Sequence, residues 1–242
     1  MYEGNNDLVI NAVGSNSGGE YDNVIINGVG NINGDIGCDL LNVNGTTNVN
    51  GTVKAKKVEI NGVGNLSGDV QCSKITVSGA GKITGKLVSE EIEVAGALSV
   101  EGGIKGEVIK VRGAIKALNL EVEDFQCDGS FSIKEMINAE IIEILLREKC
   151  EARELGGESI RVQKGYVKQS IMGSLFSPIA KEPVFTAETI EGDEIYLEYT
   201  KAKVVRGSKV VIGPGCEIVL VEYKESLEVN EKSKVKNKTF LN

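Results

Sequence analysis

Hydrophobic and polar residues alternate over short stretches of this 242-residue chain, and the stretches recur at a fixed period. From Val24, six consecutive blocks of 17 residues align without gaps. Aliphatic residues fill the first and third places of each block and recur near the ninth and thirteenth, before a small residue at the fifteenth. A period of two is that of a β-strand, so each block is predicted to hold short strands and no helix. The third place forms one row: Ile26, Val43, Ile60, Val77, Val94 and Val111.

Glycine recurs at the fifth place of every block, where the strand alternation stops. Many of these positions read Asn-Gly, a dipeptide that readily adopts a left-handed backbone, and this predicts sharp corners between about three short faces. Asn at the fourth, eighth and tenth places is expected to stack into amide ladders on the outside. The predicted corner glycines are Gly28, Gly45, Gly62, Gly79, Gly96 and Gly113.

Blocks that repeat in this way predict an all-β fold, a single-stranded parallel β-helix or solenoid with about 17 residues per coil. A lone coil exposes its aliphatic edge, but stacked coils pair as parallel strands about 4.8 Å apart and bury it. The third-place residues would then form one continuous internal rung. The preference of parallel crossovers for the right hand favours a right-handed helix.

The same alternation sets the expected domain boundaries. We expect a flexible N-terminal tail at 1–23, a β-helix at 24–168 whose six strict coils are followed by looser ones, and further coils at 184–230. A C-terminal tail is expected at 231–242. Residues 139–155 have a rival interpretation as a helix, although charged residues there alternate at period two.

Residues 169–183 break the repeat with two prolines and are expected to form a loop or insertion. Their apolar side chains either fold back over the core or present a surface for a partner or a membrane. The candidate contact residues are Ile171, Met172, Leu175 and Phe176.

Composition narrows the chemistry. The chain has no His, so His-based catalytic dyads and triads are excluded, and its net charge of −8 is mixed along the sequence without a basic stripe for nucleic acid. The five Cys form no CxxC pair. Segments such as 28–34 resemble a dinucleotide loop but recur with the repeat, which indicates corners. We therefore expect no enzyme, with no catalytic, metal-binding or cofactor-binding residues and no cofactor.

The Asn-Gly-rich coils, read with the run IEGDEIYLEYTKAKVVRGSKVVIGPGCEIVLVEYKE from Ile190, resemble the bactofilins, in particular the longer two-part members of Gram-positive bacteria. The resemblance covers about 24–230. It implies a right-handed β-helix that polymerises end to end without nucleotide. The usual short apolar N-terminal anchor of the family is not found in residues 1–7, which are polar, and the interruption at 169–183 is a second departure.

The resemblance implies a non-enzymatic cytoskeletal scaffold for envelope, cell-shape or motility machinery, with itself as the main partner. Envelope, cell-wall or flagellar assembly proteins are the further partners to expect. A start without a secretory signal predicts the cytoplasm, and an inner-membrane location is left open. The alternatives are a monomeric β-helical adaptor for an envelope or flagellar partner and, less favoured because coils of equal length raise no cleft, a carbohydrate-active β-helix.

Overall fold

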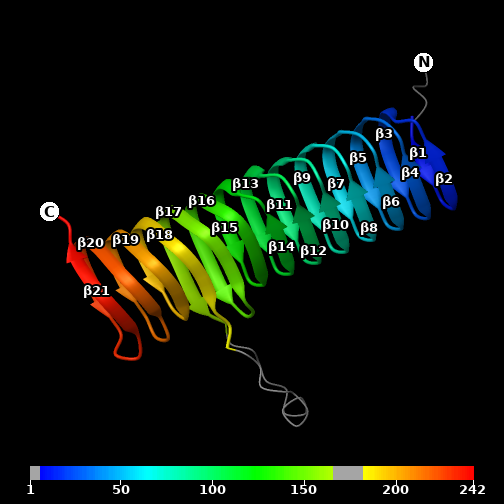
Figure 1. Ribbon diagram of the computed structural model, residues 1–242. Helices are drawn as coiled ribbons and strands as arrows, with labels where there is room; N and C mark the ends of the chain where they lie inside the picture. The colour runs from blue at the N-terminus through cyan, green and yellow to red at the C-terminus, as the bar shows by residue number, and fades with distance from the viewer. Residues whose placement is uncertain (1–5, 166–181) are drawn as a thin grey trace, which may run out of the picture. The chain divides into compact units, whose positions relative to one another are not determined.

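The computed structural model describes residues 6–165 and 182–242, which form 21 strands and no helix. The chain divides into two compact units, unit 1 up to Asp124 and unit 2 from Phe125 onward. Within each unit the strands pair in parallel, so each unit is a β-solenoid, as the repeat predicted (Figure 1). The right hand stays a prediction.

Unit 1 builds each coil from one strand of eight residues and one of four. The long strands stack on one another and the short strands do likewise, with partners 17 residues apart, as in the pairing of Ile60 with Val77. The unit 1 strands are β1 (Leu8–Ile10), β2 (Val13–Asn16), β3 (Gly19–Ile26), β4 (Val29–Ile32), β5 (Ile36–Val43), β6 (Thr46–Val49), β7 (Val53–Ile60), β8 (Val63–Leu66), β9 (Val70–Val77), β10 (Ala80–Ile83), β11 (Leu87–Val94), β12 (Ala97–Val100), β13 (Ile104–Val111), β14 (Ala114–Ala117) and β15 (Leu120–Cys127), which ends across the boundary.

The long strand itself contains a third corner. Its pairing register omits one residue near its middle, such as Glu90 in β11, and the alternation of buried and exposed residues breaks at the same point. A coil therefore has three faces. We call them the first face (the start of the long strand), the second face (its end) and the third face (the short strand).

In unit 2 the corners are tighter and each strand nearly completes a coil. Consecutive strands therefore pair directly, and Phe185 lies opposite Thr200, fifteen residues later. Alternation continues through residues 139–155, so the rival helix there is wrong. The unit 2 strands are β16 (Ser130–Leu146), β17 (Cys150–Lys164), β18 (Phe185–Leu197), β19 (Thr200–Ile212), β20 (Glu217–Val229) and β21 (Lys234–Phe240).

The coils extend beyond both expected limits. Strands β1, β2 and the start of β3 occupy part of the tail expected at 1–23, and β21 lies in the tail expected at 231–242. Leu8 pairs with Val24 at a spacing of 16, one short of the repeat, which explains why a strict 17-residue search begins at Val24. In β21 the lysines at alternate places hide the strand pattern.

The corner glycines are required for a different reason from the one expected. A left-handed backbone occurs at Gly18 and Gly215 among the described residues, but at none of the six fifth-place glycines. Instead, a Cβ at Gly79 would overlap the carbonyl oxygen of Gly62 in the preceding coil, and the same overlap recurs along the row. Close stacking of the corners therefore excludes any side chain.

Candidate interaction surfaces

The third-place row lines the interior of unit 1. Its six residues pair in register from coil to coil and each is at most 1% exposed. Apolar burial of this kind contributes roughly 25 cal/mol per Å² and binds no ligand. These residues hold the coils together, and any interaction surface must come from the outward side chains.

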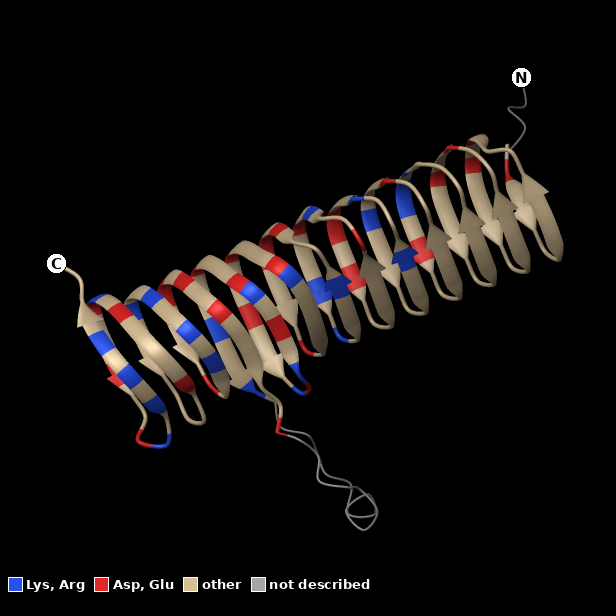
Figure 2. Ribbon diagram, viewed as in Figure 1, with Lys and Arg blue, Asp and Glu red and all other residues tan. Residues whose placement is uncertain are grey.

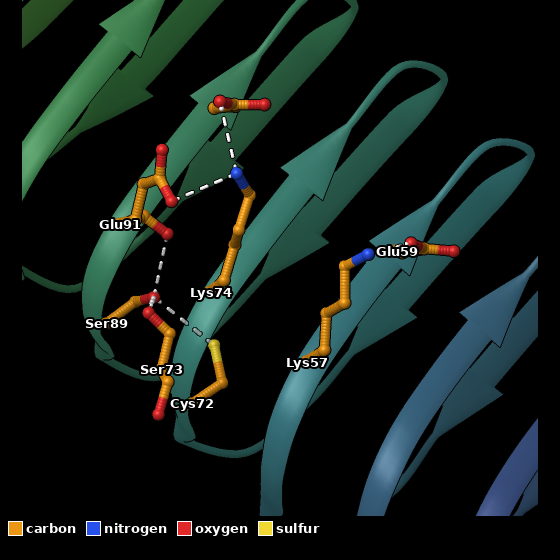
Figure 3. Close-up of polar contacts among 8 residues, drawn as sticks. Lys57, Glu59, Cys72, Ser73, Lys74, Ser89 and Glu91 are labelled. Carbon is orange, nitrogen blue, oxygen red and sulfur yellow. Dashed lines mark hydrogen bonds and ion pairs between the residues drawn. The ribbon is translucent and has the colours of Figure 1, made fainter.

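The carboxylates at 90–93 take part in surface ion pairs. Lys74 of β9 places its Nζ 2.9 Å from Glu91 and 3.2 Å from Glu93 of the next coil, and Lys57 pairs with Glu59 at 2.6 Å (Figure 3). The hydrogen bond from Lys74 lowers the pKa of Glu91, and the bond to Glu91 raises the pKa of Lys74. A carboxylate held ionised in this way is unsuited to act as a general acid.

The cysteines are protonated at neutral pH. Burial raises the pKa of Cys38 and of Cys216 to about 11 each, and it also raises the pKa of Cys72. The Cys72 thiol donates to the Ser89 hydroxyl at 3.5 Å, and that hydroxyl lies 3.0 Å from the Glu91 carbonyl oxygen (Figure 3). Thiols without thiolate character are poor nucleophiles.

Unit 2 contains a cysteine pair that the sequence did not reveal. The thiols of Cys127 and Cys150 hydrogen-bond to each other in the interior, and this bond, with burial, raises the pKa of Cys127. Their separation of 23 residues matches no repeat length, so no spacing could have predicted the contact. Both side chains are at most 3% exposed, which leaves the pair inaccessible to solvent reagents.

Each unit has a shallow groove along its first face. In unit 1 the floor includes Cys38, Ala55 and Cys72, the small residues of the fifteenth place, and the volume is about 520 Å³. In unit 2 the floor includes Ala187 and Ala202, and the volume is about 500 Å³. Rows of lysines and glutamates flank both floors. The small fifteenth-place residue thus produces a shallow furrow with mixed charge instead of an enclosed site.

Two strands have a free edge among the described residues of their units. Strand β1 pairs with β3 alone, and β21 pairs with β20 alone. In β21, Lys234, Lys236 and Lys238 alternate, and Phe240 is 55% exposed with its ring 5.5 Å from that of Tyr223. Unpaired backbone groups on an edge can accept another strand, and lysines on an edge limit unspecific pairing.

The predicted amide ladders are confirmed, and all lie in the first coils of unit 1. At the corner of the second and third faces, Asn44 donates to Asn27 at 2.9 Å and accepts from Asn61 at 3.0 Å. On the third face, Asn48 donates to Asn31 and Asn65 donates to Asn48. From residue 78 onward the corner row continues with Ser78 and Ala95, so the ladders stop.

Asn44→Ala should lower the free energy of unfolding by about 1 kcal/mol, because it removes two ladder hydrogen bonds worth roughly 0.5 each at an exposed position. Ser78 occupies the same corner place in a coil without a ladder, so Ser78→Ala should change stability much less. Urea denaturation of the two variants would measure the difference. Equal midpoints would show that the ladder contributes nothing to stability.

Metal and membrane features were searched over residues 6–165 and 182–242. That part of the chain holds no group of three or more Cys, Asp or Glu placed to bind a metal ion. It also holds no helix of the length and hydrophobicity needed to cross a membrane. The candidate contact residues Ile171, Met172, Leu175 and Phe176 lie outside the described residues.

Comparison with known proteins places part of this chain in a family. The model of the bactofilins, described as polymer-forming cytoskeletal, matches residues 3–88. The uncharacterized protein YhbF of Bacillus subtilis (strain 168) is 43% identical over 89 residues, 37% of this chain and 34% of YhbF. YhbE of the same organism is 38% identical over 112 residues, 45% of this chain and 44% of YhbE. The chain thus covers less than half of either relative. No solved structure matches.

Proposed function

The chain carries a bactofilin domain at residues 3–88, and from this premise we propose that it is a non-enzymatic bacterial scaffold that self-assembles end to end. The match to a polymer-forming cytoskeletal family is the observation that carries the proposal. The function is mechanical: the protein forms a regular polymer on which other proteins are positioned.

The free edges support end-to-end assembly physically. A solenoid coil buries its two edges against its neighbours, so an uncovered coil leaves unpaired N–H and C=O groups and aliphatic surface. Strands β1 and β21 present such edges, and the exposed Phe240 supplies apolar contact area beside one of them. Pairing of these edges between copies extends the sheet without any new fold.

Assembly of this kind uses no nucleotide. The glycine-rich segments that resemble phosphate loops form coil corners, where the space beside Gly62 and Gly79 is occupied by carbonyl groups of the neighbouring coil. A phosphate would need backbone N–H groups pointing at open space. The free energy of assembly then comes from strand pairing and apolar burial alone.

The proposed location is the cytoplasm, with the inner face of the membrane as a site where the polymer could act. The proposed partners are a second copy of the chain and proteins of the envelope, the cell wall or the flagellum. In this role the polymer organises cell-shape, envelope or motility machinery.

Purified protein without nucleotide is expected to form filaments that are visible by negative-stain electron microscopy and pellet at high centrifugal speed. Phe240→Lys should abolish them, because it adds a fourth alternating lysine to the edge of β21 and removes the exposed ring. Addition of ATP or GTP should leave the wild-type pellet unchanged.

Val88→Lys is the matched control, because Val88 is also an exposed apolar residue, at 42%, but lies on the first face away from both edges. It should leave the filaments intact. A wild-type protein that stays monomeric at high concentration would contradict self-assembly and would favour the monomeric adaptor, which pull-down experiments with envelope proteins would then test.

A further inference from the structure

The third face of the first coils in unit 1 is flat, uncharged and partly apolar. Its outward side chains come from β2, β4, β6 and β8 and form two rows in register from strand to strand. One row is Val13, Val29, Thr46 and Val63, whose valines are 80%, 40% and 42% exposed. The other contains the ladder Asn31, Asn48 and Asn65. We call this surface the amide face.

Charge separates the amide face from the rest of these coils. The four short strands contain no Asp, Glu, Lys or Arg, whereas each of the long strands β3, β5, β7 and β9 contains at least one (Figure 2). The chain carries a net charge of −8, so copies repel each other on average. The amide face is where two copies can meet at the lowest electrostatic cost.

The polar groups of the amide face are already satisfied along the ladder. The Asn48 amide donates to Asn31 at 3.0 Å and accepts from Asn65 at 2.9 Å. Removing water from an amide costs little when its hydrogen bonds are kept within the sheet. Stacked identical side chains with amide ladders are also the surface that pairs dry against a like sheet.

From these three properties we propose that the amide face is the lateral contact between copies of this chain, with two polymers lying face to face through their valine and asparagine rows. The inference rests on the proposed self-assembly and adds a second, sideways contact to it. A second copy is the fitting occupant, because its own amide face is equally flat, uncharged and satisfied.

The size of the face determines when the contact forms. Four strands spaced about 4.8 Å apart, each with four residues of about 3.3 Å, give roughly 250 Å² per copy. A stable pair of proteins buries about 800 Å² per partner, so two free copies do not stay joined through this face. In a polymer the face recurs with every subunit, and the contacts act together. Lateral association is therefore a property of filaments and produces bundles.

Salt gives the contact a distinct signature. The facing rows carry no charge, while the rest of the two polymers is negative, so screening of the repulsion should increase bundling as NaCl is raised. A contact made by ion pairs would weaken under the same change. Bundling that falls with salt would therefore overturn the proposal.

The direct test introduces a charge into the face. Val63→Lys and Val88→Lys replace valines of equal exposure, 42%, on the amide face and on the first face of unit 1. Bundles pellet at low centrifugal speed and single filaments only at high speed. We expect Val63→Lys to reduce the low-speed pellet at least tenfold and to leave the high-speed pellet unchanged, while Val88→Lys changes neither. Circular dichroism melting confirms that both variants fold.

The remaining outcomes overturn the inference in distinguishable ways. Bundles that persist in Val63→Lys, or wild-type filaments that never bundle at any salt concentration, refute the lateral contact and leave end-to-end assembly standing. Loss of binding to phospholipid vesicles in Val63→Lys with bundles intact would assign the face to a membrane. If the wild type forms no filaments, the proposed function fails, and sedimentation equilibrium of concentrated wild type against Val63→Lys decides the face: no difference between them refutes it.

Discussion

Val77→Asp is expected to unfold the solenoid of unit 1. Val77 is 0% exposed and lies between Ile60 and Val94 in the internal row, with no polar partner in reach of a new carboxylate. A buried charge without a partner costs about 4 kcal/mol or more, a large part of the 5–15 kcal/mol that stabilises a typical domain. Because neighbouring coils stabilise each other, the damage spreads along the stack.

Far-UV circular dichroism with thermal melting measures this effect on the full chain. Val88→Asp is the control, because it introduces the same charge at a position that is 42% exposed in the adjacent coil. The control should melt close to the wild type, whereas Val77→Asp should lose its cooperative transition. Equal melting of the two variants would contradict the burial of the third-place row.

Gly79→Ala is expected to destabilise unit 1 by about 1–3 kcal/mol, the usual cost of overpacking. A Cβ at this position would overlap the Gly62 carbonyl oxygen, and its other near neighbour, the Asn61 carbonyl carbon, would lie at 2.7 Å. Both obstacles are backbone atoms and cannot turn away as a side chain could. The backbone at Gly79 is not left-handed, so the effect isolates close stacking from conformational strain.

Gly156→Ala provides a control of opposite sign. A Cβ there meets nothing nearer than the Asn138 Oδ1 at 3.5 Å, an ordinary contact. Alanine also reduces the freedom of the unfolded chain, so this variant should be neutral or more stable by about 0.4–1 kcal/mol. Denaturant midpoints compare the two. A Gly79→Ala variant as stable as Gly156→Ala would show that the corners can separate without cost.

Interior residues of unit 1 were predictable because burial imposes a strict alternation and stacking imposes a strict period. The row from Ile26 to Val111 follows from both, and so do the parallel pairing and the amide ladders. Coils of other lengths were not found by the same search. The pairing of Leu8 with Val24 is one residue short, and that of Phe185 with Thr200 is two residues short. A change in corner length alters the period without altering which residues are buried.

The reason for the fifth-place glycines was also beyond the sequence. An Asn-Gly dipeptide indicates a turn, but the same residues serve either a left-handed backbone or a close approach of two chains. The second explanation holds at Gly79, since it is the carbonyl group of Gly62, seventeen residues away, that excludes a side chain. Local sequence does not contain the position of that neighbouring coil.

The sequence by itself determined the fold class, the parallel stacking of unit 1 and the residues of its interior, because these depend on periods that packing enforces at every coil. Tertiary structure alone decided where the coils begin and continue, which strands have free edges, and which outward residues gather on one face. Outward side chains such as Val63 and Asn48 are not constrained by burial, so their pattern acquires meaning only when stacking sets them beside their counterparts in the neighbouring coils.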